Sequence, residues 1–125
     1  MVLARAATES AWGTSRFARE GNNFFGQWCF KPGCGLLPHA RAPGKRHELA
    51  VFANAEAAVA AYFHNINKHK AYAEVRRLRA GLRQQQLPLS SELLATGLER
   101  YSERGGVYIR ELHAVMQSNK LHHYD

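Results

Sequence analysis

Apolar positions recur with a helical period at both ends of the chain and lose that period in the middle. The first periodic segment covers residues 2–11, where one face carries small and apolar side chains: Leu3, Ala6, Ala7 and Ser10. Gly13 is expected to end this helix. Thr14-Ser15 could cap a short second helix that runs through Arg19 and is ended by Gly21-Asn22-Asn23. Small residues on the first face would let another helix approach closely.

Between Phe24 and Phe52 the helical period is absent, and glycine and proline interrupt the chain repeatedly. Two short strands are predicted over about 35–41 and 46–52. The sequence Ala-Pro-Gly-Lys at 42–45 has the composition of a turn that would join them. This stretch therefore predicts a β-hairpin inserted between helices.

Helical periodicity returns after Asn54, which is placed to cap a helix over about 55–67. Further helices are predicted over about 70–85, from Ser90 or Ser91 to about Tyr101, and after Gly105-Gly106 to about Lys120. The pattern predicts a mainly α protein of the α+β class with a small inserted hairpin. No repeat or linker divides the 125 residues, so one domain is expected.

Charge and composition narrow the possible partners. The net charge is +7, which favours polyanions such as nucleic acid or an anionic cell-wall polymer. The basic residues are scattered and match no nucleic-acid motif, so no nucleic-acid partner is expected. No apolar run approaches the ~20 residues of a membrane span. The start of the chain shows no signal-peptide pattern.

Glu9 is the first candidate for chemistry, because it lies at the edge of the apolar face of the first helix. It could be a surface carboxylate paired with Arg5 four residues earlier. It could instead be a general acid kept protonated by partly apolar surroundings. Aromatic side chains close to it in sequence could form either a core or a sugar-stacking groove: Trp12, Phe24, Phe25, Trp28 and Phe30.

Three short motifs follow one another in this region: Thr8-Glu9-Ser10-Ala11-Trp12-Gly13, Ser15-Arg16-Phe17-Ala18 and Asn22-Asn23-Phe24-Phe25-Gly26. Together they resemble the signature of the glucosaminidase domains of glycoside hydrolase family 73, and within it the bacterial Bax-type proteins. The resemblance continues through Gly44–Glu48, Ala61–Asn65 and Gly97–Ser102, and covers nearly the whole chain. Thr8 and Ala11 depart from the pattern, which usually has Leu and Gly there.

The resemblance implies a lysozyme-like helical domain that hydrolyses β-1,4 bonds between N-acetylglucosamine and N-acetylmuramic acid in peptidoglycan. It places the general acid on Glu9 and requires no cofactor or metal. It points to a groove lined by Trp12, Asn23, Phe24, Phe25 and Trp28, and to a periplasmic or cell-envelope location. Family domains usually begin further upstream, so residues 1–125 are expected to lack the N-terminal part. A monomer acting on glycan strands is expected.

A glycosidase usually needs a second carboxylate or a substitute for it. The candidates are Glu20, Glu48, Glu56 and Glu103, of which Glu48 is preferred because it falls in the predicted hairpin. It could equally be a surface residue of the hairpin, and the 2-acetamido group of the substrate could replace it. Tyr101 resembles a tyrosine that lines the family's cleft, although it could also be a half-buried core residue.

Cys29 and Cys34 enclose the turn sequence Phe-Lys-Pro-Gly, and three interpretations stay open. A disulfide would suit an oxidising periplasm, free thiols would suit a cytosol, and a zinc site could recruit His39 and His47. The disulfide is preferred, since the histidine spacing suits zinc poorly.

Two rival functions stay open beside the hydrolase. A lytic transglycosylase would share the helix that ends in a catalytic Glu-Ser and would need no second carboxylate. A non-catalytic wall-binding module would bind peptidoglycan without turnover. The products formed from peptidoglycan would separate the three.

Overall fold

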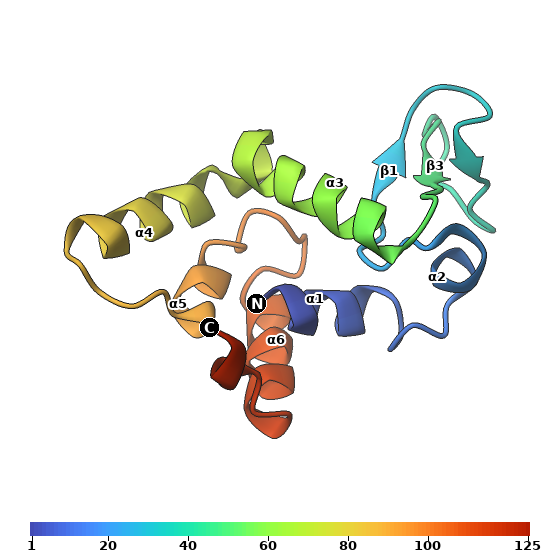
Figure 1. The fold of residues 1–125 in the computed structure, drawn as a ribbon. Helices are drawn as coiled ribbons and strands as arrows, with labels where there is room; N and C mark the ends of the chain where they lie inside the picture. The colour runs from blue at the N-terminus through green and yellow to red at the C-terminus, as the bar shows by residue number, and fades with distance from the viewer. The chain divides into compact units, whose positions relative to one another are not determined.

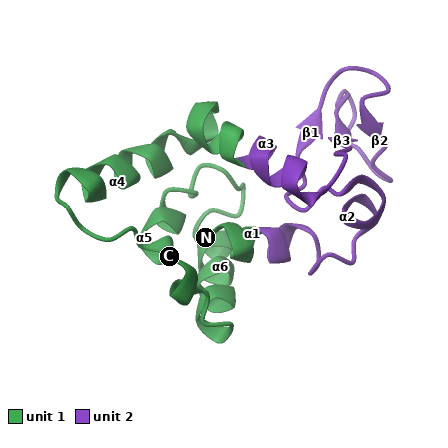
Figure 2. Ribbon diagram, in the orientation of Figure 1, with its two compact units in different colours: residues 1–5, 63–125 green, residues 6–62 purple.

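A computed structural model describes all residues 1–125 and confirms the mainly helical α+β class (Figure 1). Along the chain the elements are α1 Val2–Glu9, α2 Arg16–Gly21, β1 Trp28–Cys29, β2 Gly35–Leu36, β3 Glu48–Ala50, α3 Ala55–Lys68, η1 Lys70–Tyr72, α4 Ala73–Gln84, α5 Ser91–Thr96, α6 Gly106–Ser118 and η2 Leu121–Tyr124. None of the helices combines the length and the apolar character that crossing a bilayer requires. The chain divides into two compact units, residues 1–5 with 63–125 and residues 6–62 (Figure 2).

The predicted helix caps are present in the structure. The Ser15 hydroxyl accepts a hydrogen bond from the Ala18 N–H at 3.2 Å, and Asn54 Oδ1 accepts one from the Ala57 N–H at 2.8 Å. The Ser90 hydroxyl accepts one from the Leu93 N–H at 3.3 Å. Each cap satisfies a backbone donor that the first turn of a helix leaves unpaired, which explains why these helices begin where the sequence predicted.

Unit 1 contains η1, α4, α5, α6 and η2, with the first turn of α1 and the end of α3. Residues four apart on α6 point into its core: Tyr108, Leu112 and Met116. The helix predicted from Ser90 to Tyr101 ends earlier, at Thr96. Gly97 then approaches α4 so closely that a Cβ there would lie 2.8 Å from the Val75 nitrogen. Tertiary packing, which local propensity does not report, sets this helix end.

Unit 2 contains α2, the sheet, the end of α1 and the start of α3. The sheet has the order β1-β3-β2, and both neighbours run antiparallel to β3. The predicted hairpin is therefore present as β2 and β3, but its strands are shorter and its connection longer than expected. A turn does form at 42–45, where the Lys45 N–H donates to the Ala42 carbonyl at 3.1 Å.

The third strand, β1, was not predicted from the sequence. Trp28 pairs with Leu49, and Cys29 pairs with Glu48, so β1 covers the other edge of β3. Two residues are too few to show the alternation by which a strand is recognised. Gly35 allows the opposite edge to close, since a Cβ there would lie 2.0 Å from the Leu49 carbonyl oxygen.

Candidate active site

Glu9 is the last residue of α1, and its side chain is half-buried. The next residue fastens the end of the helix. The fully buried Ser10 hydroxyl donates to the Ala6 carbonyl at 2.6 Å and accepts from the Gly13 N–H at 2.8 Å. The Trp12 N–H also turns back to the Ala7 carbonyl, at 2.8 Å. These bonds satisfy groups that a helix end leaves open and fix the direction in which Glu9 leaves the helix.

The turn after Glu9 is built from consecutive left-handed residues. Ala11 has φ +51°, Trp12 +57° and Gly13 +80°. Only glycine adopts such values without steric cost, so Ala11 and Trp12 are strained. Ala11 is also the position at which this chain departs from the glycine of the resembled pattern. The strain lies immediately beside the candidate acid, where backbone strain is often found at functional sites.

A second turn, Asn22–Gly26, comes up against the carboxyl of Glu9. Asn22 closes α2 in the left-handed conformation, with φ 51°. A Cβ on Gly26, whose φ is +63°, would lie 3.8 Å from Glu9 Oε2. Backbone without a side chain therefore borders the carboxyl. Two of the three motifs that carry the resemblance, those containing Glu9 and Gly26, thus meet in space at this point.

Asn23 holds this second turn from inside the unit. It is fully buried. Its Nδ2 donates to the carbonyls of Gln27 at 2.9 Å and Ala50 at 3.0 Å, and its Oδ1 accepts from the Gln27 N–H at 3.0 Å. These bonds use both amide hydrogens and tie the turn to β3. The structure thus gives Asn23 a supporting place under the site and no surface for a sugar.

The candidate aromatic residues separate into two groups. Phe25 is buried and stacks on Tyr62, with ring centroids 4.1 Å apart and planes at 2°. Phe24 is half-buried, with its ring about 4.0 Å from the position of a Cβ on Gly13. Trp12 and Trp28 are exposed, by 64% and 50%. Only the exposed rings can offer a whole face to a sugar, so Phe25 belongs to the core that supports them.

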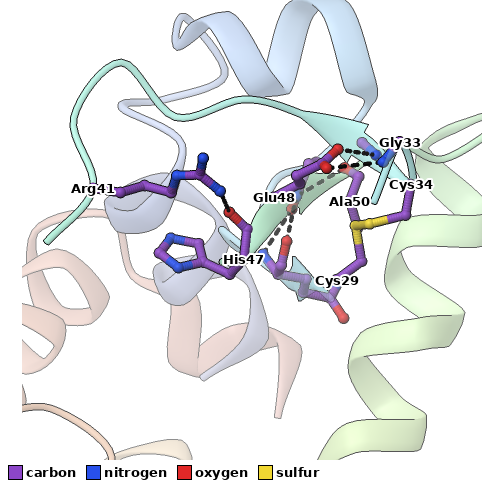
Figure 3. The surroundings of a disulfide bond; sticks show 10 residues. Cys29, Gly33, Cys34, Arg41, His47, Glu48 and Ala50 are labelled. Carbon is purple, nitrogen blue, oxygen red and sulfur yellow. Dashed lines mark hydrogen bonds between the residues drawn. A yellow bond between two sulfur atoms is a disulfide. The ribbon is translucent and has the colours of Figure 1, made fainter. Parts of the chain in front are cut away.

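Cys29 and Cys34 form a disulfide, with 6.3 Å between their Cα atoms (Figure 3). Glu48, from the central strand, reaches across the loop that the disulfide closes. Its Oε2 accepts from the Gly33 N–H at 2.9 Å, and its Oε1 accepts from the Gly35 N–H at 3.0 Å. Only 7% of Glu48 is exposed. Both carboxylate oxygens thus hold the backbone of the loop.

These bonds also fix the charge of Glu48. The Gly33 and Gly35 N–H groups, followed by the positive charge of Arg41, lower the pKa of the Glu48 carboxyl below its ordinary value. Such a group stays ionised, as a nucleophile or base must be, but its oxygens already have partners. The geometry describes an anchor for the disulfide loop more closely than a carboxylate facing a substrate.

Tyr101 lies in unit 1 and packs on a buried arginine. The guanidinium carbon of Arg5 lies 4.1 Å from the centre of the Tyr101 ring, a cation–π distance. Arg5 is fully buried; its Nε donates to the Tyr108 hydroxyl at 3.0 Å and its Nη1 to the Tyr72 hydroxyl at 2.8 Å. Arg5 is therefore not a solvated surface residue of α1. This cluster was not predicted from the sequence, because an arginine on a short helix usually faces solvent.

The zinc interpretation finds no support in the described residues. No group of three or more His, Cys, Asp or Glu side chains converges on a potential metal position. His47 instead stacks on Trp28, with centroids 3.6 Å apart.

Comparison with known proteins decides the family. The glucosaminidase family, described as mannosyl-glycoprotein endo-beta-N-acetylglucosaminidase, matches residues 1–121. The chain belongs to the glucosaminidase family. It is also 38% identical over 120 residues to protein bax of Escherichia coli (strain K12). That match covers 96% of this chain but only 42% of the relative, so the chain spans about two fifths of that protein's length. No solved structure matches significantly.

Membership of a family of glycoside hydrolases gives the geometry around Glu9 a chemical context. Glu9 is a half-buried carboxyl at a helix end, bordered by a glycine turn, and this makes it a candidate for the general acid that a glycosidase needs. Sequence reasoning named Glu9 and the aromatic residues as candidates. It missed Ser10 as the fastener of the helix end, His47 as a partner of Trp28, and the cluster around Arg5.

Proposed function

We propose that this glucosaminidase domain hydrolyses the β-1,4 bond between N-acetylglucosamine and N-acetylmuramic acid in peptidoglycan, with Glu9 as general acid. The observation that carries the proposal is the place of the half-buried Glu9 carboxyl beside the glycine turn, where a Cβ on Gly26 would lie 3.8 Å from Glu9 Oε2. The net charge of +7 favours an anionic wall polymer as the partner.

In this mechanism the protonated Glu9 carboxyl gives its proton to the glycosidic oxygen as the bond to the anomeric carbon breaks. The substrate's own 2-acetamido oxygen supports the anomeric carbon from the other face and forms a cyclic intermediate. Water then attacks that carbon and returns a proton to the Glu9 carboxylate. We favour the acetamido group over Glu48 in this role, because both Glu48 oxygens accept backbone hydrogen bonds.

The hydrogen bonds that occupy both Glu48 oxygens also agree with a second candidate function. A lytic transglycosylase also needs no second carboxylate, since the muramic acid 6-hydroxyl replaces water as the nucleophile. A cell-envelope location is part of the proposal, and the Cys29–Cys34 disulfide supports it, because disulfides persist in oxidising compartments.

Mass spectrometry of purified peptidoglycan after digestion tests the proposal. Products with ordinary reducing ends are expected from the wild type, and none from Glu9→Gln, which keeps the shape of the side chain but has no acidic proton. Glu92→Gln is the matched control on the exposed surface of α5 and should digest as the wild type does. Products ending in 1,6-anhydromuramic acid would establish the transglycosylase instead. Binding without any product would establish a wall-binding module.

A further inference from the structure

The disulfide lobe of unit 2, residues 28–49, carries an exposed aromatic surface formed by Trp28 and Phe30. Trp28 pairs with Leu49 across β1 and β3, so His47, two residues before Leu49, lies on the same face as Trp28. The two rings stack with centroids 3.6 Å apart and planes at 8°. Phe30 meets Trp28 edge to face, with centroids 6.3 Å apart and planes at 69°.

This arrangement leaves aromatic surface open to solvent. Trp28 is 50% exposed and Phe30 is 69% exposed, although burying such rings is strongly favourable. His47 stacks on the Trp28 ring and Phe30 meets it edge to face. Neither ring covers the part of the indole that is exposed to solvent. His47 Nδ1 is buried with no hydrogen-bond partner, so the imidazole contributes its face and not a polar contact on that side.

The lobe that holds these rings is rigidly built. The Cys29–Cys34 disulfide closes the loop that bears Phe30, and Glu48 holds that loop through Gly33 and Gly35 (Figure 3). Arg41 Nη1 donates to the His47 carbonyl at 3.0 Å and ties the long connection back to β3. A surface held in this way binds a ligand at a low cost in side-chain ordering.

The charge around the rings is of one sign. Residues 28–47 contain four basic side chains and no acidic one: Lys31, Arg41, Lys45 and Arg46. The following carboxylate, Glu48, is turned inward onto the loop. An anionic polymer with flat apolar faces therefore fits this surface, and a glycan strand whose muramic acid units carry carboxylates has both properties.

We propose that Trp28, His47 and Phe30 form a sugar-stacking platform that holds a peptidoglycan glycan strand, with His47 and Phe30 supporting the Trp28 ring. The pyranose face lies on the exposed part of the Trp28 ring, His47 supports that ring from its stacked side, and the basic residues attract the strand's carboxylates. This inference rests on the substrate class of the proposed function but not on the role of Glu9.

Binding is measured in a Glu9→Gln background, so that turnover plays no part and failure of the catalytic proposal is seen separately. The chain has two tryptophans, so Trp12→Phe leaves Trp28 as the only indole reporter. Titration with a β-1,4 N-acetylglucosamine tetramer is expected to change the Trp28 emission saturably. His47→Ala should weaken that binding roughly fivefold, since an aromatic stack contributes about 1 kcal/mol.

Sedimentation with purified sacculi supplies the second measurement. Trp28→Ala should reduce the bound fraction severalfold, whereas Leu37→Ala, which removes another exposed apolar side chain of the same lobe, should not. Binding of Trp28→Ala at the wild-type level, with its disulfide intact, would overturn the proposal. So would a Trp28 emission that shifts with anionic phospholipid vesicles and not with the tetramer, because the patch would then be a membrane contact.

Discussion

Two glutamates of unit 2 were candidates for the same chemistry, and their surroundings are opposite. Glu48 lies in the central strand, almost fully buried, with each carboxylate oxygen accepting a backbone N–H. Glu9 lies half-buried at the end of α1, beside a glycine turn in which a Cβ on Gly26 would lie 3.8 Å from its carboxyl. The Glu48 carboxylate holds the backbone of a loop, whereas the Glu9 carboxyl is bordered by the backbone of a turn.

This contrast shows that the role of a carboxylate depends on its hydrogen-bond partners and not on the helix or strand that carries it. The predicted hairpin was the reason to prefer Glu48 as the second catalytic carboxylate. Glu48 instead closes the loop of a disulfide, where the loop's own N–H groups need an acceptor. Activity, stability and the pH dependence of stability should each distinguish Glu9 from Glu48.

The largest effect is expected for Glu9→Gln. Loss of the acidic proton should lower the rate of peptidoglycan hydrolysis by roughly 10²–10⁴-fold, the usual contribution of general acid catalysis. The free energy of unfolding should change much less than the rate does, because glutamine keeps the size and shape of the Glu9 side chain. Glu48→Gln should show the reverse, with more stability lost than activity per molecule of folded protein.

Zymography and urea unfolding of both variants check this contrast. If Glu48→Gln abolishes turnover while the protein unfolds at the wild-type urea concentration, Glu48 is a catalytic group and the assignment as an anchor is wrong.

Removal of the disulfide is expected to come next in size. Replacing Cys29 and Cys34 by serine should lower the free energy of unfolding by about 2 kcal/mol, the chain-entropy value for so short a loop. Since Glu48 and the disulfide restrain one loop, their effects should not add. A double-mutant cycle followed by urea unfolding measures the coupling, and strictly additive losses would show that the two restraints act separately.

A smaller effect is expected from pH. The pKa of Glu48 is lower in the folded protein than its ordinary value of 4.5, so the ionised carboxylate stabilises the fold above that pH. The contribution is lost as the pH falls through the folded-state pKa. The difference in unfolding free energy between wild type and Glu48→Gln should therefore shrink from pH 6.5 to pH 3.5. The exposed Glu20→Gln serves as the control, and a difference that is independent of pH would contradict the anchor.

The smallest expected effect concerns the strained turn beside Glu9. Ala11 has φ +51°, so Ala11→Gly should raise the unfolding free energy by about 1 kcal/mol. Ala6→Gly, inside α1, should lower it by roughly 0.5–1 kcal/mol, which makes it a matched control. Thermal or urea unfolding of the two variants decides the sign. Destabilisation by both changes would show that Ala11 is not strained.

Much of the fold could be predicted because its signals are local. Ser15, Asn54 and Ser90 cap the helices that follow them, and each cap depends only on a side chain and the next three residues. The strands were harder to place. β1 has two residues, and it exists because Trp28 and Cys29 find partners on β3 about twenty positions later in the chain.

The family pattern, the helix starts and the candidate acid could be predicted from the sequence, since each depends on a contiguous stretch of residues. The surroundings of each candidate group could be seen only in the tertiary structure. It brought Gly26 against Glu9, turned Glu48 inward onto the disulfide loop, and set His47 on Trp28. The physical reason is that hydrogen-bond partners and packing depend on residues distant in sequence. A side chain's type gives its possible chemistry, and its neighbours in space select which part of that chemistry is used.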